Sequence, residues 1–161
     1  MACKGLPVFI DAIEKLALSG HSVSISVMGE GDITAVMLRL KNLGVNLVNR
    51  WLTAEEIAQA YRDHHAVVLS HLEASQSGIA STAIGAGIPV IALPVSGVAE
   101  QVHDGITGVL ALDVTADALA QALARFMTEP GLYDRLQVGS TRYQSDHSVD
   151  RFVAEAGERL L

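Results

Sequence analysis

The sequence has a single cysteine, no long apolar run and few positive charges, and each of these absences excludes a class of protein. A lone cysteine, Cys3, cannot form an internal disulfide, which is typical of the reducing cytoplasm. No apolar run reaches the ~18 residues of a transmembrane helix, and the N-terminus lacks the charged and then apolar pattern of a signal peptide. We therefore expect a cytoplasmic chain without a transmembrane segment.

The charge balance argues against a nucleic-acid partner. The chain has 11 Lys and Arg residues against 18 Asp and Glu residues, which gives a formal net charge of −7. Phosphate backbones reward clustered Lys and Arg side chains, whereas the positive residues here are scattered. A small anionic ligand held by a few donors remains compatible with this balance.

What is present predicts one globular domain. The 161 residues are 50% apolar and 18% charged, and neither an internal repeat nor a linker divides them. Periodicity alternates between strand and helix, which indicates an α/β fold with a Rossmann-like parallel sheet flanked by helices. The expected strands are 22–28, 45–49, 66–69, 90–93 and 109–112; the expected helices are 5–19, 32–43, 53–63, 79–86, 98–102, 119–127, 132–139 and 149–161. Thr53 and Glu56 are expected to form a capping box, and Asp32 and Thr115 to cap the helices that follow them.

The most informative stretch begins with the apolar run 66–69 and continues into a polar loop. The loop ends at Ser77 and Gly78, where an Ala-rich helix is expected. Ligands of open α/β sheets bind at the carboxyl ends of strands, and helix N-termini there present free N–H groups to anions. Ser75, Gln76, Ser77 and Gly78 therefore predict a phosphate-binding turn.

Other motifs leave alternatives open. Gly29 and Gly31 follow a strand and serve either a sterically demanding turn or a phosphate contact. They lack the third glycine of a dinucleotide-binding motif, and the sequence has no P-loop. Trp51 is expected either to pack in the core or to hold a nucleobase. Ser77 lies outside a G-x-S-x-G turn, which disfavours a serine hydrolase.

We expect no metal site. His64, His65 and His71 fall on different predicted elements, without matched cysteine or carboxylate spacing. The sequence also has no Asp-x-Asp pair that would chelate a divalent ion on a nucleotide diphosphate. His64 and His65 are instead expected to interact with the C-terminus of a helix.

Several of these segments together resemble a known family, namely the C-terminal, nucleotide-sugar-binding domain of retaining glycosyltransferases of family 4, which have the GT-B fold. The similarity is greatest to members with the loop Glu-Ala-Ser-Gln-Ser-Gly, many of which are bacterial exopolysaccharide enzymes. The segments that carry the resemblance are 4–6, 27–31, 49–51, 73–78, 87–90, 96–102 and 104–108.

The resemblance implies roles for individual residues. Lys4 corresponds to the family lysine that binds the donor diphosphate, and Glu73 to the first acidic residue of the pair beside the donor sugar. Residues 75–78 would hold a phosphate, and the loops with Gly29, Gly31 and Trp51 would lie near the nucleotide. The substrate implied is a nucleotide diphosphate sugar, with no cofactor and no metal.

The chain also departs from the family pattern. Thr82 replaces the second acidic residue, which holds the donor ribose, so ribose recognition must differ or weaken. Ser70 and His71 replace a proline and a tyrosine, and Ser96 replaces the first glycine of a Gly-Gly pair.

The family places more chain before Lys4, which only three residues precede here. That upstream chain comprises an N-terminal acceptor domain, followed by the first strand of the donor-binding domain. In the family this strand ends in an arginine, which is the second cation that binds the diphosphate. The resemblance therefore implies a missing N-terminal domain, an isolated chain without activity and, for the full-length enzyme, either a cytoplasmic position or a peripheral one at the inner membrane. We expect the gap in the sheet to be closed by pairing of 22–28 with 66–70, or by a second copy in a homodimer.

Two other functions remain open. A degenerate, non-catalytic nucleotide-binding or dimerisation module would explain Thr82 and the absent second cation. An epimerase or phosphorylase with the GT-B fold is the other alternative, although no lysine environment for pyridoxal phosphate is recognisable.

Overall fold

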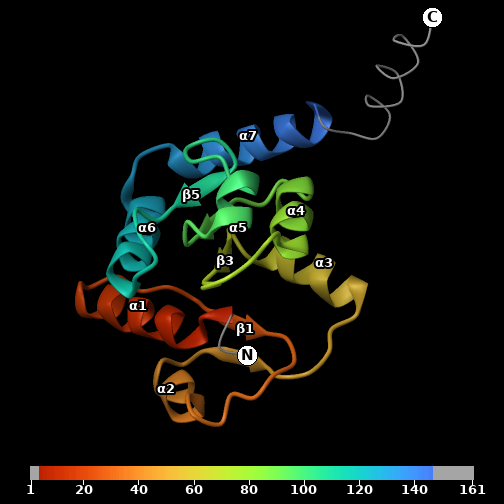
Figure 1. The fold of residues 1–161 in the computed structure, drawn as a ribbon. Helices are drawn as coiled ribbons and strands as arrows, with labels where there is room; N and C mark the ends of the chain where they lie inside the picture. Colours follow the sequence, from red (N-terminus) through yellow and green to blue (C-terminus); the bar gives the residue numbers. More distant parts are fainter. Residues whose placement is uncertain (1–3, 147–161) are drawn as a thin grey trace, which may run out of the picture.

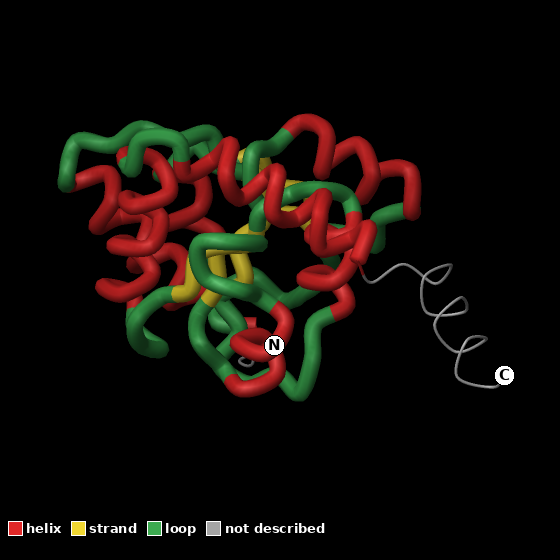
Figure 2. The backbone as a smooth tube through the Cα atoms, turned by 90° about the horizontal axis from the view of Figure 1, so that it is seen from above, coloured by secondary structure: helices red, strands yellow, loops and turns green. Residues whose placement is uncertain are grey.

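A computed structural model of the chain describes residues 4–146, and it confirms the predicted α/β class (Figure 1). Figure 2 shows the strands in the middle of the molecule with helices around them. The elements in chain order are α1 (Leu6–Leu18), β1 (Ser26–Met28), α2 (Met37–Asn42), β2 (Asn46–Val48), α3 (Ala54–Asp63), β3 (Val67–Leu69), α4 (Gly78–Gly85), β4 (Val90–Ala92), α5 (Ser96–Gln101), β5 (Gly108–Leu110), α6 (Ala116–Thr128) and α7 (Leu132–Asp146).

A three-stranded parallel sheet in the order β3-β4-β5 forms the centre of the fold. Successive side chains of a strand point to opposite faces, and here each face has its own core. Ile91 packs in a core with α1 and α6, whereas Val90 and Ala92 pack in a second core with α4 and α5. Both faces are therefore covered by helices, as expected for a parallel sheet.

β1 and β2 form a separate two-stranded parallel sheet, in which Ser26 is paired with Asn46. One face of this small sheet packs on the core of α1 and α6, through Ile25, Val27 and Leu47. Both sheets therefore share one hydrophobic core.

The predicted pairing of 22–28 with 66–70 is wrong, because among the described residues β1 pairs with β2 alone and β3 with β4 alone. Side chains rather than backbone join the two sheets, since Val27 and Val68 pack against the same core. One polar link adds to this: His64 Nε2 lies 2.8 Å from Ser26 Oγ. A second copy that closes the gap stays a prediction.

The carboxyl end of β3 is occupied by the beginning of the described chain. Ser70 Oγ donates to the Lys4 carbonyl at 2.9 Å, and Gly5 packs so closely that an added Cβ would lie 1.7 Å from the Ser70 carbonyl oxygen. Gly5 also has a φ of 63°, a region that favours glycine. This contact fixes where Lys4 lies.

Local capping signals were read correctly at two helices. Thr53 Oγ1 accepts from the Glu56 N–H at 3.3 Å, and the Glu56 carboxylate accepts from the Thr53 N–H at 3.0 Å. Thr115 caps α6 by accepting from the Ala118 N–H. Asp32, in contrast, was expected to cap a helix and does not, because its carboxylate accepts from the Thr34 N–H in a turn before α2.

The helix expected over 132–139 continues to Asp146. Gly139 lies inside α7 and does not end it. The glycine instead allows α7 to pack closely on the loop before β5, since an added Cβ would lie 2.0 Å from the Ile106 carbonyl oxygen. The helix expected over 149–161 lies outside the described residues. Within residues 4–146, no helix has the length and apolarity needed to cross a membrane.

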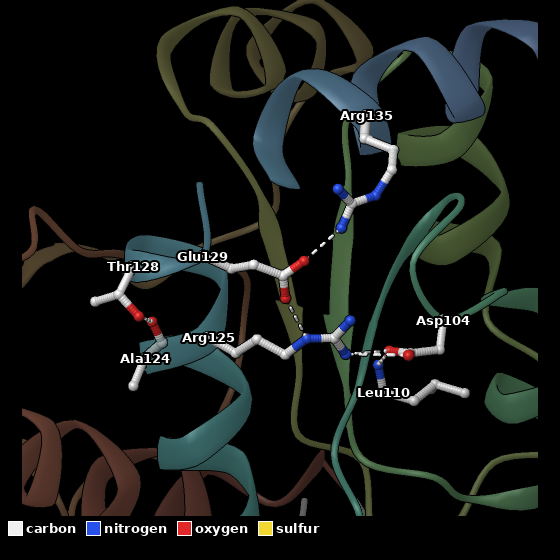
Figure 3. A network of polar contacts seen from close by, with 7 residues as sticks. All are labelled: Asp104, Leu110, Ala124, Arg125, Thr128, Glu129 and Arg135. Atoms are coloured by element: carbon white, nitrogen blue, oxygen red, sulfur yellow. Dashed lines mark hydrogen bonds and ion pairs between the residues drawn. The ribbon is translucent and has the colours of Figure 1, made fainter. Parts of the chain in front are cut away.

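A surface network of charges joins the loop before β5 to α6 and α7 (Figure 3). Arg125 contacts the Asp104 carboxylate at 3.0 Å and the Glu129 carboxylate at 2.8 Å, and Arg135 also contacts Glu129. Asp104 accepts in addition from the Leu110 N–H. Exposed pairs contribute up to ~1 kcal/mol each, so the network adds little to the stability of the fold.

Packing of α1 on the shared core can be tested with two leucines of one helix. Leu16 is 2% exposed and Leu18 is 89% exposed. Leu16→Ala should lower the free energy of unfolding by about 2–5 kcal/mol because it leaves a cavity, whereas Leu18→Ala should change it by less than about 0.5 kcal/mol. Urea unfolding followed by circular dichroism measures both, and equal effects would contradict the packing described.

Candidate functional site

A cavity of about 890 Å³ lies between α3 and α4, where the chain leaves β3. It brings together most of the residues predicted from the sequence: Lys4, Glu73, Ser75, Gln76, Ser77, Gly78 and Thr82. Three further predicted residues, Gly29, Gly31 and Trp51, are not among its lining residues. Residues that were not predicted also line the cavity: His71, Ala74, Ile79 and, from α3, Ala54, Ile57, Ala58 and Tyr61.

Ser77 begins α4, and its polar groups are engaged within the protein. Its hydroxyl accepts from the Ala80 N–H at 3.3 Å, as an N-cap residue does. Its N–H donates to Gln101 Oε1 at 2.8 Å, and the Gln101 amide also donates to the Ser77 carbonyl and to Ser81 Oγ. Ser77 therefore shapes the turn, and Gln101, which sequence reasoning did not single out, holds that turn against α5.

Gly97 allows the same loop to lie directly on α5. Its N–H donates to the Ala74 carbonyl at 3.1 Å, and an added Cβ would lie 1.8 Å from the Ser75 carbonyl oxygen. The family pattern has two glycines here, and the second is the one that the contact requires.

The first turn of α4 leaves two donors available. Gly78 and Ile79 occupy positions whose N–H groups have no carbonyl partner inside the helix, and no other described residue accepts from them. Both residues line the cavity. The N-terminal end of α4 therefore has free donors for an anion, which is the kind of ligand that the loop sequence predicts.

Lys4 extends along the cavity toward His71, and their side chains are in contact. Lys4 Nζ lies 2.9 Å from His71 Nε2. The His71 side chain is only 9% exposed. Burial of the ring, together with the positive charge of Lys4, lowers the pKa of His71 below its ordinary value. His71 is therefore neutral near pH 7, and Nε2 accepts from the ammonium group.

The acidic and hydroxyl residues of the cavity differ in how they are held. Glu73 is exposed, and its carboxylate makes no hydrogen bond or ion pair with the described residues. The Thr82 hydroxyl lies 2.7 Å from the Tyr61 hydroxyl and 2.9 Å from the Gly78 carbonyl. Thr82 thus joins α4 to α3, whereas Glu73 is available to a ligand.

α3 forms an apolar wall of the cavity. None of its residues is fully buried, although its sequence is amphipathic. Ile57, Ala58 and Tyr61 line the cavity, and Tyr61 also packs against the core of α4 and α5. The apolar side of α3 therefore lines a ligand-sized space as well as meeting that core. The amphipathic pattern would have identified this face, but only the tertiary structure shows what it faces.

Gly29 and Gly31 have backbone N–H groups that are already bonded. The Gly29 N–H donates to the Val48 carbonyl at 3.0 Å, and Gly29 has a φ of 131°. The Gly31 N–H donates to Asn49 Oδ1 at 2.9 Å, and Asn49 donates back to the Gly31 carbonyl at 2.9 Å. These contacts favour the reading as a turn, and a role in donor binding stays a prediction.

Trp51 lies on the loop between β2 and α3 and is 80% exposed. The expectation that it packs in the core is therefore wrong, because the loop carries it away from both hydrophobic cores. Contact with a nucleobase stays a prediction.

The histidines do not form a metal centre in the part of the chain that the structure describes, where no group of three or more His, Cys, Asp or Glu side chains gathers. His64 Nδ1 lies 2.8 Å from the Ala60 carbonyl, which confirms that it interacts with the end of α3. His65 does not, since its ring packs edge-on against Tyr133 with 5.4 Å between ring centres.

Comparison with known proteins identifies the family. A family model described as "Glycosyl transferases group 1" matches residues 1–129. The chain belongs to this family. A D-inositol 3-phosphate glycosyltransferase of Actinosynnema mirum is 33% identical over 125 residues, which are 73% of this chain and 30% of that protein. The corresponding protein of Streptomyces bingchenggensis is 31% identical over 119 residues, 72% of this chain and 26% of that protein. This glycosyltransferase chain thus spans less than a third of the length of these curated relatives.

Solved structures share the fold at lower sequence identity. A glycosyltransferase of Rickettsia africae superposes with a TM-score of 0.78 at 18% identity, over 98% of this chain and 44% of that chain. Anabaena HepE in complex with UDP-glucose superposes with a TM-score of 0.77 at 18% identity, over 99% of this chain and 46% of that chain. The fold is that of a GT-B glycosyltransferase domain.

The contact between the loop and α5 predicts a large effect of one methyl group. Gly97→Ala should lower the free energy of unfolding by about 1–3 kcal/mol, because the new Cβ meets backbone that must shift. Gly85→Ala in α4 is the control: nothing lies within 4 Å of its added Cβ, and it should be neutral or stabilising by up to ~1 kcal/mol. Urea unfolding of both variants is the measurement; a neutral Gly97→Ala would contradict the close approach.

Burial of His71 predicts a pH dependence of stability. The pKa of the folded ring lies below the ordinary value of 6.5, so between the two values the unfolded chain binds more protons and stability rises with pH. The contribution is complete above pH 6.5 and is lost as the pH falls through the folded pKa. From pH 7.5 to about 5.5, wild type should therefore lose more stability than His71→Gln. Urea unfolding at both pH values tests this, and equal losses would contradict it.

Proposed function

We propose that this chain is the donor-binding half of a retaining glycosyltransferase of family 4. The enzyme transfers a sugar from a nucleotide diphosphate sugar to a glycan or a lipid-linked acceptor. One observation carries the proposal: a single cavity collects the Lys4 ammonium group, the free N–H groups of Gly78 and Ile79, and the free carboxylate of Glu73.

These groups match the two halves of the substrate. Negative charge grows on the diphosphate as the bond to the sugar breaks, and a fixed cation together with helix N–H groups stabilises such charge. Lys4 is a compact cation suited to this role. The Glu73 carboxylate accepts hydrogen bonds from sugar hydroxyls. Because the cavity supplies its own positive charge, the proposed reaction needs no metal and no cofactor.

UDP-sugars are the first donors to consider. Anabaena HepE, which shares the fold, has been crystallised with UDP and with UDP-glucose. The loops with Gly29, Gly31 and Trp51 are proposed to lie beside the nucleotide. The exposed indole of Trp51 offers a flat apolar face to a base, and aromatic side chains stack readily on bases.

The acceptor site is assigned to an N-terminal domain, which is the main partner of this chain. Since the chain spans less than a third of its curated relatives, the isolated chain is proposed to bind a nucleotide weakly and to transfer no sugar. We place the full-length enzyme in the cytoplasm or peripherally at the inner membrane.

A second function is favoured by one contact. The Thr82 hydroxyl is bonded to Tyr61 and to the Gly78 carbonyl, so the position that holds the donor ribose in the wider family offers no carboxylate and no free hydroxyl. A non-catalytic nucleotide-binding or dimerisation module is therefore the alternative proposal.

Calorimetry separates the two proposals. Wild type should bind at least one of UDP, GDP and ADP at millimolar concentration or better. A hydrogen bond to a charged group contributes about 1.5–3 kcal/mol, so Lys4→Ala should weaken binding of the diphosphate about tenfold to a hundredfold. Glu73→Ala should weaken UDP-glucose more than UDP.

Lys15→Ala is the control, because Lys15 pairs with Asp117 away from the cavity; it should leave affinity unchanged. Absence of binding to all three nucleotides would contradict a donor site. Binding that is indifferent to both cavity variants would favour the non-catalytic module, and sugar transfer by the isolated chain would refute its proposed inactivity.

A further inference from the structure

We propose that His71 positions Lys4 for binding of the donor diphosphate, by holding the Lys4 ammonium group through Nε2 of a neutral ring. This inference rests on the proposed function and adds a residue to its site. The two side chains come from segments far apart in the sequence that meet at the carboxyl end of β3, Lys4 from the segment before α1 and His71 from the loop after β3, and Nζ lies 2.9 Å from Nε2.

The chemistry of the contact fixes the proton on the ring. An ammonium group has three donors and no acceptor, so Nε2 must present its lone pair and the neutral ring must carry its proton on Nδ1. Lys4 keeps two N–H bonds for another acceptor. Titratable or charged groups that line the cavity with His71 are Lys4, Glu73 and Tyr61.

The other ring nitrogen indicates that His71 is not placed for stability alone. Nδ1 is buried and has no hydrogen-bond partner among the described residues, although buried polar groups are generally paired. His64 of the same chain shows the structural arrangement, with Nδ1 beside the Ala60 carbonyl and Nε2 beside Ser26 Oγ. Among the described residues, the hydrogen bond to Lys4 is the only one that the His71 ring makes.

Directing the ammonium group has a consequence for binding. Lysine is a flexible side chain that loses conformational freedom when a ligand orders it. An acceptor that already holds Nζ beside the cavity removes part of this cost before the ligand arrives. A neutral ring does so without adding the competing negative charge that a carboxylate would bring.

A double-mutant cycle with inorganic pyrophosphate as the probe tests the inference. In the full chain, His71→Leu should weaken pyrophosphate binding about threefold to tenfold. In the Lys4→Ala background the same substitution should change affinity by less than about twofold, because nothing remains to be positioned. His71→Gln, which keeps a side-chain acceptor, should restore part of the loss. His65→Leu, at an exposed histidine outside the cavity, should have no effect.

A measurement on the wild type covers the case in which a variant folds poorly. ¹⁵N NMR of the histidine rings should show His71 protonated at Nδ1 and unprotonated at Nε2. The opposite tautomer would overturn the inference, and so would equal losses from His71→Leu in both backgrounds.

The outcomes separate this inference from the proposed function. Coupling of His71 to Lys4 with pyrophosphate, in a chain that binds UDP no better than pyrophosphate, would support the positioning role and contradict the nucleotide site. Binding of UDP that depends on Lys4 but not on His71 would support the nucleotide site and contradict the positioning role. Absence of binding to pyrophosphate and UDP would overturn both.

Discussion

Packing of α1 against α6 is the contact on which the rest of the structure depends. The two sheets exchange no backbone hydrogen bond within the described residues, so a shared apolar core must join them. Ile10 and Leu16 of α1 and Leu119 of α6 are buried in that core, where each buried side chain contributes about 1.5–3 kcal/mol. The same helix places Lys4, which lies two residues before Leu6, at the carboxyl end of β3. The stability of the split sheet and the position of the cation thus have one cause.

The site differs from the core in how firmly its walls are held. On one side the loop before α4 is fixed by Gln101 and by the close approach of Gly97 to the Ser75 carbonyl. On the other side α3 has no buried residue. It meets α4 through the hydroxyl contact between Tyr61 and Thr82 and through packing of Tyr61 against the core of α4 and α5. Regions with few buried apolar contacts open at low free energy. The loop that is proposed to bind a phosphate is therefore held firmly, whereas the apolar wall of α3 can adjust to a ligand.

Sequence reasoning succeeded where the determining contacts are local. Thr53 and Glu56, which form the capping box, are only three positions apart, and the apolar run over 90–93 was sufficient to assign a buried strand. The candidate loop could be recognised because its residues are contiguous. Gln101 and Tyr61 were missed because their partners lie 24 and 21 residues away. Asp32 was misassigned because its carboxylate has a competing backbone donor two residues on, and the pairing of the first and third strands was wrong because strand order depends on contacts that no local pattern encodes.

The charge of the cavity limits what the isolated chain can do. Among the lining residues Lys4 and Glu73 carry opposite charges and His71 is neutral, so attraction for a diphosphate depends on one cation and on the two N–H groups at the start of α4. A pair of unit charges 4 Å apart gains about 1 kcal/mol in water but ~4 kcal/mol at an effective dielectric constant of 20. Most residues that line the cavity are exposed or half-buried, so charges in it interact at a strength close to the aqueous limit. A domain that covered the cavity would exclude water and move the attraction between Lys4 and a diphosphate toward the stronger limit. Such a domain would contribute to affinity even without direct contact with the ligand.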